Sequence, residues 1–322
     1  MKDFSELQSL INDEIHKIDF PSYPSNLYDP IKYILNLRAK RMRSIALLTS
    51  FQIYNSDLKV ATEAALAIEV FHNFTLIHDD IMDNASLRRG SQTVHEKWDR
   101  NIAILSGDTM LVKSYSLLLG LDLSIQRDVL EVFSETAQKV CEGQQLDMDF
   151  ENMDNLSIDQ YLEMIKLKTS VLLAASFQIG ALIGGASKPD ALFLYNYGLN
   201  LGIAFQLQDD LLDLYGDKNK FGKNIGGDII SNKKTFLYLK SLSIANDNQR
   251  NNLLTYYLNN DLSAKQKIES VKSIFDELNI YDITKDFISS YHHKAISCLN
   301  SVTVSNHNSL NYFADLLLQR EV

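Results

Sequence analysis

The stretch LKVATEAALAIEVFHNFTLIHDDIMD, residues 58–83, decides the fold of this chain. It has the length and apolar content of a buried helix, and it ends in a group of three aspartates. The same acidic pattern, D-D-x-x-D, returns in FQLQDDLLD, residues 205–213. Because residues four apart share one face of a helix, each copy presents its three carboxylates over about one helical turn.

Carboxylates within apolar helices need partners, because burying an unpaired charge is costly. Oxygen-only ligands favour Mg²⁺, so both motifs are predicted to bind magnesium. The candidate metal ligands are Asp79, Asp80, Asp83, Asp209, Asp210 and Asp213. A solvated polar stripe is one alternative for the first helix, although the sequence around Glu69, His72 and Asp79 is very apolar. A structural network with Arg88 and Arg89 is another, and it accounts for one copy better than for two.

The composition favours an all-α protein. The chain has 322 residues, is 45% hydrophobic and contains 13 glycines and 4 prolines, which is few for a turn-rich β-sandwich. Helical periodicity dominates, and no Pro- or Ser-rich linker divides the chain, so we predict a single domain over residues 1–322. The segment FPSYPSNLYDP, residues 20–30, holds three of the four prolines and is predicted to be a loop.

The net charge, the two cysteines and the N-terminal residues argue against several classes of protein. A net charge of −10 disfavours non-specific nucleic-acid binding. Cys141 and Cys298 form no CxxC pair and are predicted to be reduced thiols. The N-terminal residues lack the apolar core of a signal peptide, and no 18-residue window is uninterruptedly apolar, so we predict no transmembrane helix. We therefore expect a cytoplasmic protein.

Basic side chains follow both acidic motifs. Arg88 and Arg89 come just after Asp83, and GDKNKFGKNIGGD, residues 216–228, places four glycines and three lysines after the second motif. Magnesium together with Arg and Lys is the usual means of binding a diphosphate, because metals bridge its oxygens and guanidinium groups bind them in pairs. GxGxxG and Walker A patterns are absent, which argues against the common nucleotide sites.

These motifs together resemble the trans-polyprenyl diphosphate synthases of the short-chain isoprenoid synthase family. LIHDDIMDNASLRRG, residues 76–90, is similar to the first aspartate-rich motif of that family, and FQLQDDLLD followed by GKNIGGDIISNKKT, residues 222–235, is similar to the second. Smaller matches are KRMR (40–43), Gly107-Asp108, GQQLD (143–147) and Lys168-Thr169. The resemblance thus spans residues 40–235, with both motifs in the expected order.

The sequence departs from the family at two places. The family pattern G-G-K-R-x-R-P reads Arg38-Ala39-Lys40-Arg41-Met42-Arg43-Ser44, without either glycine or the proline. The proline that usually follows the K-x-T segment is also missing from KKTFL. The backbone geometry of the first loop is therefore left open, although its basic residues remain.

The resemblance implies an all-α bundle of about twelve to fourteen helices around a deep central cavity, usually in a homodimer. It implies a Mg²⁺-dependent prenyltransferase that joins an allylic diphosphate to isopentenyl diphosphate and releases diphosphate. Asp79, Asp83 and Asp209 would bind about three Mg²⁺ ions with the allylic diphosphate. Asp80, Asp210 and Asp213 would be their partners or would support the ligands.

The resemblance also assigns residues to the two substrates. The allylic diphosphate would be bound by Arg88, Lys168, Lys223 and Lys233. The diphosphate of isopentenyl diphosphate would be bound by Lys40, Arg43, His72 and Arg89. Thr169 and Gln206 would lie near the developing allylic cation, where their dipoles stabilise it.

Residues on the first acidic helix are candidates for limiting product length. Phe74 and Thr75 lie about one turn before Asp79, and Phe71 lies one turn deeper. Phe74 is either an ordinary core aromatic or the floor of the product cavity. One aromatic beside a small Thr resembles geranylgeranyl-type enzymes, so we predict products of about fifteen to twenty carbons.

Three other functions share some of these features. A terpene cyclase uses similar ionisation chemistry but normally lacks a second D-D-x-x-D with its basic tail. An HD-type metal phosphohydrolase is suggested by His72 and His78-Asp79, but it would leave the second motif without a role. A non-catalytic subunit of a heteromeric synthase tends to lose one acidic motif, whereas this chain keeps both.

Overall fold

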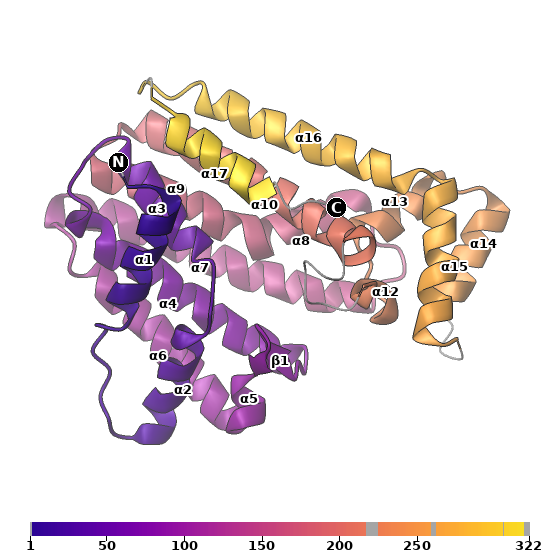
Figure 1. Cartoon of the computed structure of the whole chain (residues 1–322), viewed down its shortest axis with the longest axis horizontal. Helices are drawn as coiled ribbons and strands as arrows, with labels where there is room; N and C mark the ends of the chain where they lie inside the picture. Colours follow the sequence, from indigo (N-terminus) through magenta and orange to yellow (C-terminus); the bar gives the residue numbers. More distant parts are fainter. Residues whose placement is uncertain (1, 217–224, 259–261, 305, 319–322) are drawn as a thin grey trace. The chain divides into compact units, whose positions relative to one another are not determined.

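The computed structural model describes residues 2–216, 225–258, 262–304 and 306–318 (Figure 1). Within these ranges the regular structure is helical apart from one antiparallel pair of short strands, β1 and β2, in which Arg88 pairs with Ser91. The prediction of an all-α fold is therefore confirmed.

The chain forms two compact units. Unit 1 comprises residues 1–137, 172–195 and 301–313, and unit 2 comprises residues 138–171, 196–300 and 314–322. The division falls inside three long helices, so each unit contains a part of these helices. The single-domain organisation over 1–322 stays a prediction.

Unit 1 is built around α4, the helix that ends in the first acidic motif. Its sequence is apolar on nearly all sides, and it packs against α3 and α6. The elements that lie wholly or mainly in unit 1 are α1 (Phe4–Ile15), α2 (Ser25–Asn36), α3 (Met42–Gln52), α4 (Lys59–Met82), β1 (Leu87–Arg88), β2 (Ser91–Gln92), α5 (Val94–Lys97), α6 (Arg100–Leu118) and α9 (Val171–Gly184). The helices α7 (Leu123–Glu151), α10 (Lys188–Tyr215) and α17 (Asn308–Leu318) are divided between the units.

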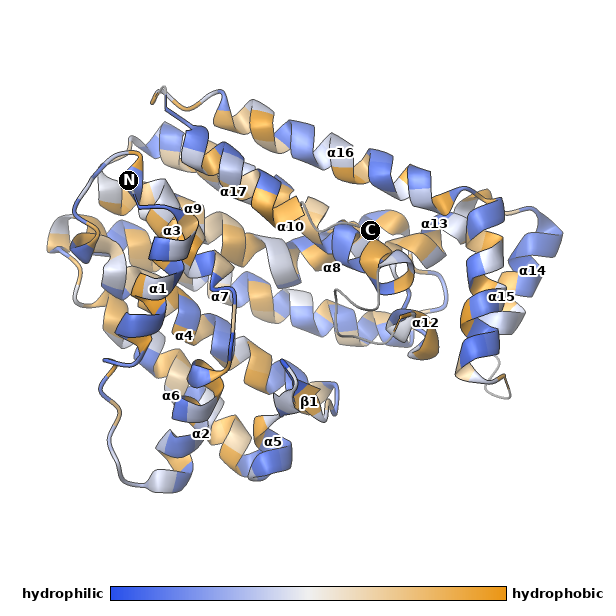
Figure 2. Ribbon diagram, viewed as in Figure 1, coloured by the Kyte–Doolittle hydropathy of each residue, from blue (hydrophilic) through white to orange (hydrophobic). Residues whose placement is uncertain are grey.

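Unit 2 contains the second acidic motif and most of the C-terminal helices. Its elements are α8 (Ile158–Ile165), the π-helical turn η1 (Lys166–Ser170), α12 (Gly227–Ile230), α13 (Phe236–Ile244), α14 (Asp247–Leu258), α15 (Ala264–Glu277) and α16 (Ile280–Leu299). Its core centres on Leu207, Leu211 and Phe236. Figure 2 shows that α15 and α16 carry many hydrophilic residues, which is expected of amphipathic helices that bury one face.

The loop predicted for residues 20–30 is wrong in its second half, because α2 begins at Ser25. Pro24 has an extended backbone and precedes the first helical residue, a position where proline is well tolerated. Pro30 lies inside α2 and gives up one backbone hydrogen bond there. The buried face formed by Pro30, Ile31 and Ile34 offsets that loss.

Two helical stretches are long and apolar enough to cross a membrane, namely Lys59–Met82 and Ile158–Gly184. However, 67% and 72% of their most apolar windows are buried within the structure. Helices that are apolar all round and covered on most sides are typical of a protein core.

Candidate active site

The first acidic motif separates into two kinds of carboxylate. Asp79 and Asp83 lie four residues apart at the end of α4, half-buried and exposed respectively, whereas Asp80 is 1% exposed. Arg88 donates to Asp80 Oδ1 from Nε at 2.9 Å and from Nη2 at 2.5 Å. Burial raises the pKa of Asp80, and the bonds from Arg88 act against that rise. Asp80 therefore positions Arg88, while Asp79 and Asp83 present the more accessible oxygens of the motif.

The R-R-G tail of the first motif forms a tight turn between β1 and β2. Arg89 and Gly90 are its two central residues, with φ of 53° and 76°. Left-handed values at both positions are those of a type I′ hairpin turn, which explains the glycine. The turn sends Arg88 to Asp80 and Arg89 to Asn73, whose Oδ1 accepts from Arg89 Nη1 at 3.4 Å. The two adjacent arginines therefore bond two different residues of α4.

Arg43 and His72, predicted to bind the same diphosphate, are in direct contact. Arg43 Nη1 lies 3.1 Å from His72 Nε2. A guanidinium can only donate, so His72 Nε2 accepts and the imidazole is neutral. Burial lowers the pKa of His72 well below its usual value, and the charge of Arg43 lowers it further. Among the described residues no acceptor bonds the buried Nε of Arg43, so this guanidinium keeps a donor for an anion.

Arg41, the middle basic residue of the K-R-x-R segment, is not available to substrate. Its guanidinium donates to Asn12 Oδ1 at 3.1 Å, to Glu69 Oε1 at 2.8 Å and to the carbonyls of Leu35 and Leu37. Ser44, which replaces the family's proline, donates from Oγ to Glu69 Oε2 at 2.9 Å. The buried Arg41–Glu69 pair therefore holds this loop against α4.

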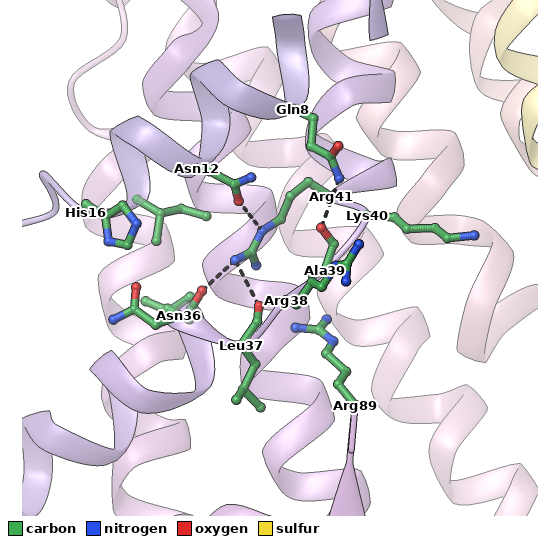
Figure 3. Close-up of a pocket in the computed structure, with 12 residues that line it drawn as sticks. Gln8, Asn12, His16, Asn36, Leu37, Arg38, Ala39, Lys40, Arg41 and Arg89 are labelled. Atoms are coloured by element: carbon green, nitrogen blue, oxygen red, sulfur yellow. Dashed lines mark hydrogen bonds between the residues drawn. The ribbon is translucent and has the colours of Figure 1, made fainter. Parts of the chain in front are cut away.

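A cavity of about 780 Å³ lies beside this loop (Figure 3). Its lining includes three basic side chains beside Arg41, those of Arg38, Lys40 and Arg89, and no carboxylate. Lys40 and Arg89 were predicted from sequence to bind the diphosphate of isopentenyl diphosphate. The other lining residues are Gln8, Asn12, Ile15, His16, Leu35, Asn36, Leu37 and Ala39. Sequence patterns did not indicate the α1 residues or Arg38, because only the folded chain brings α1 to the loop.

The second motif, in unit 2, also combines a buried carboxylate with a more accessible one. Asp210 is 5% exposed and accepts hydrogen bonds from the Tyr161 hydroxyl, from Gln206 Nε2 at 3.3 Å and from the Phe236 N–H at 3.4 Å. Burial raises the pKa of Asp210 to about 8, with a further rise from Asp228. Asp209, by contrast, is half-buried, so the accessible carboxylate again neighbours a buried one.

Asp213 holds the chain that follows the second motif. Its Oδ2 accepts from the Asp228 N–H at 3.0 Å, and its carbonyl accepts from the Gly226 N–H at 2.7 Å. These bonds place the short helix α12 beside the end of α10. In this structure Asp213 therefore supports the loop through one oxygen of its carboxylate.

The π-helical turn η1 presents Lys168 and Thr169. A π-turn inserts one extra residue into a helix and is common at functional sites; here it lies between α8 and α9. Lys168 Nζ donates to Asp147 Oδ2 at 2.5 Å, and the Thr169 hydroxyl donates to Gln206 Oε1 at 3.4 Å. A Cβ on Gly143 would collide with the backbone nitrogen of Lys168, so only glycine lets α7 approach this turn so closely.

Lys233 lies in a segment that α14 and α15 hold in place. Lys267 is buried and donates to the side chain of Asn232, and the Tyr257 hydroxyl donates to the carbonyl of Lys233. Lys267 and Tyr257 are separated from this segment by more than twenty residues, so sequence patterns gave no sign of them. Lys223, also predicted to bind substrate, lies outside the described residues.

Phe74 and Phe71 belong to a run of aromatic rings in unit 1. The Phe74 ring lies 5.5 Å from Phe71, and the Phe71 ring lies 5.2 Å from Phe133 of α7. Thr75 instead bonds its own helix, with its hydroxyl donating to the His72 carbonyl at 2.8 Å. Phe74 thus has an aromatic layer behind it.

The donor set fits a hard divalent cation, although the described residues contain no group of three or more His, Cys, Asp or Glu side chains that could hold a metal. Asp79 and Asp83 offer carboxylate oxygens four residues apart, and the buried Oδ2 of Asp80 has no hydrogen-bond partner among the described residues. Carboxylates with room for water suit Mg²⁺. The HD-type alternative fails here, because His72 contacts Arg43 and His78 Nε2 contacts the Ile104 carbonyl at 3.2 Å.

Comparison with known proteins identifies the family. A model of the polyprenyl synthetase family matches residues 24–278. The geranylgeranyl diphosphate synthase of Saccharolobus solfataricus is 36% identical over 327 residues, covering 98% of this chain and 97% of that protein. The geranylfarnesyl diphosphate synthase of Natronomonas pharaonis is 37% identical over 253 residues, covering 73% and 74%.

A solved structure supports the same assignment. The crystal structure of a geranylgeranyl pyrophosphate synthase matches with a TM-score of 0.94 at 43% identity, over 100% of both chains. The prediction of family and reaction type is therefore confirmed. The chain belongs to the polyprenyl synthetase family and is a short-chain trans-prenyl diphosphate synthase.

Proposed function

We propose that this enzyme joins an allylic diphosphate to isopentenyl diphosphate and releases all-trans products of about fifteen to twenty carbons. The R-R-G turn is the single observation that carries this proposal. It bonds Arg88 to the metal motif through Asp80 and places Arg89 in the cationic cavity, so one turn connects the binding groups for two diphosphates.

The proposed reaction breaks the bond between the allylic carbon and its diphosphate oxygen, and the electron pair leaves with the diphosphate. The double bond of isopentenyl diphosphate then forms the new carbon–carbon bond, and a proton lost from the adduct goes to the departing diphosphate. Bound Mg²⁺ would stabilise the leaving charge. Asp79, Asp83 and Asp209 would hold it, with Asp80, Asp210 and Asp213 in support.

The chain's own cations and dipoles complete the proposed site. Arg88, Lys168 and Lys233 would bind the allylic diphosphate, and Lys40, Arg43 and Arg89 would bind the other, with neutral His72 beside Arg43. The Thr169 hydroxyl and Gln206 amide would face the allylic cation, which fixed dipoles stabilise without reorganisation. We further propose that the enzyme acts in the cytoplasm, in keeping with two free cysteines.

The decisive assay is incubation of the purified protein with Mg²⁺, isopentenyl diphosphate and each of three allylic primers, followed by sizing of the products. We expect condensation that depends on both Mg²⁺ and isopentenyl diphosphate. Turnover of an allylic diphosphate alone would indicate a terpene cyclase. Inactivity with every primer would favour a non-catalytic subunit and overturn the proposal.

Phe74 is proposed to limit product length, with Phe71 behind it and Thr75 beside it. Replacing Phe74 by alanine removes one ring from this aromatic run, so chromatography of the products should show longer chains. Thr75→Phe should act in the opposite direction and shorten them. An unchanged product distribution in both variants would show that this part of α4 does not form the floor.

A homodimer is proposed from an exposed apolar stripe along α6 and its C-cap residue Leu119. Leu105, Val112 and Leu119 are spaced by seven residues and are 59%, 66% and 61% exposed. Seven-residue spacing places them on one side of the helix, as in helix–helix interfaces. Light scattering should show a dimer for the wild type and a monomer for Val112→Glu. A monomeric wild type would refute this proposal.

A further inference from the structure

We propose that Arg38 is an additional binding residue for the diphosphate of isopentenyl diphosphate, at a position where the family pattern has glycine. The inference rests on the proposed function and deepens it. Arg38 lines the same cavity as Lys40 and Arg89, both assigned to that diphosphate. In Figure 3, Arg89 extends from β1 toward the segment that carries Arg38 and Ala39.

The loop accepts arginine at this position without backbone strain. Arg38 and Ala39 are not among the residues with positive φ, so neither position needs glycine. The left-handed residue is Arg41, with φ of 55°. Side chains hold the loop instead: Gln8 Nε2 donates to the Ala39 carbonyl at 3.1 Å, and Arg41 is bonded on all sides (Figure 3).

Arg38 is exposed at the cavity, so its guanidinium is open to an incoming anion. Arg41 is paired with Glu69, and Arg38 and Arg89 are two further arginines of the lining. A cavity that is lined by arginines and by no carboxylate attracts an anion such as diphosphate.

The location of Arg38 also predicts which substrate it serves. Arg88, the cation of unit 1 that is assigned to the allylic diphosphate, does not line this cavity. Of the groups assigned to isopentenyl diphosphate, Lys40 and Arg89 line it and Arg43 and His72 do not. Arg38 should therefore change the KM for isopentenyl diphosphate and leave the KM for the allylic primer and kcat nearly constant. A residue that only stabilised the loop would alter all three or none.

Steady-state kinetics of the full-length enzyme test this inference. Arg38→Gly restores the family residue and should raise the KM for isopentenyl diphosphate roughly tenfold, the effect of one charge-assisted contact to phosphate. Arg38→Ala should match it, and Arg38→Lys should recover most of the loss. Arg127→Ala, which removes an exposed arginine that does not line the cavity, is the matched control and should leave the KM unchanged.

Calorimetry with inorganic diphosphate, without Mg²⁺, separates the two possible failures. Weaker diphosphate binding by Arg38→Gly than by wild type supports the inference even if no condensation is found. An active enzyme whose KM for isopentenyl diphosphate does not respond to Arg38→Gly would overturn the role of Arg38 and leave the proposed function intact. Equal diphosphate binding by both proteins would overturn it as well.

Discussion

Asp79→Asn is expected to lower kcat by roughly a thousandfold or more with saturating Mg²⁺, because a neutral amide is a much poorer ligand for a hard cation. Asp79 is half-buried at the end of α4, with Asp83 four residues further on. Loss of one ligand removes several kcal/mol of stabilisation from the leaving diphosphate. Raising the Mg²⁺ concentration should recover part of the activity, which initial rates over a magnesium titration would measure.

Asp80→Asn is the matched variant one residue away. Asp80 is buried and bonds Arg88, so its replacement should lower thermal stability and weaken binding of the allylic diphosphate. Asp79→Asn should lower the melting temperature less than Asp80→Asn does, because Asp79 is only half-buried. If both variants lost activity and stability equally, Asp79 would have a structural role rather than the role of a metal ligand.

Arg41→Met is expected to lower the free energy of unfolding by about 3–5 kcal/mol, because it leaves Glu69 as a buried carboxylate without its counter-charge. Arg41 and Glu69 have side-chain exposures of 3% and 1%, and their atoms approach to 2.8 Å. Urea denaturation followed by circular dichroism would measure the loss. The change should also disturb substrate binding, since Glu69 bonds Asn73, which accepts from Arg89.

The double variant Arg41→Met/Glu69→Leu separates the cost of an unpaired charge from the value of the pair. It should be more stable than Arg41→Met alone, because no buried charge is left without a partner. The exposed pair Arg127–Glu131 provides the contrast, and Arg127→Ala should cost no more than about 0.5 kcal/mol. A loss below that value for Arg41→Met would contradict the role assigned to the pair.

The sequence was sufficient to predict the helical fold and the extent of α4, because apolar periodicity is a local property. It failed at Pro30, where three nearby prolines suggested a loop but tertiary burial of Ile31 and Ile34 supports a helix. It also missed the π-turn at Lys166–Ser170. The residues of that segment suit an α-helix, and the close approaches of Gly143 to Lys168 and of Gly202 to Ser170 join positions far apart in the sequence.

The sequence predicted the charged residues of the candidate site but not the residues that bond to them. The resemblance separated Asp79, Asp83 and Asp209 from the supporting Asp80, Asp210 and Asp213, but it gave no partners for them. Asp80 and Asp210 are buried and bonded to Arg88 and to Tyr161. Tyr161 is 49 residues from Asp210, and no local pattern connects positions so far apart. The missing glycine at position 38 was visible, and the charge that replaced it was the signal that could have suggested a further ligand for the cavity.

The left-handed Arg41 has a consequence for how such loops can evolve. In this chain the shape of the loop is held by side chains of Arg41, Asn12 and Gln8, and glycine is no longer needed to make the turn. Positions 38 and 39 therefore do not need the backbone freedom of glycine, and other residues can occupy them. Sequence drift at these two positions should be tolerated by the fold and should adjust substrate affinity, whereas drift at Arg41 should be rejected.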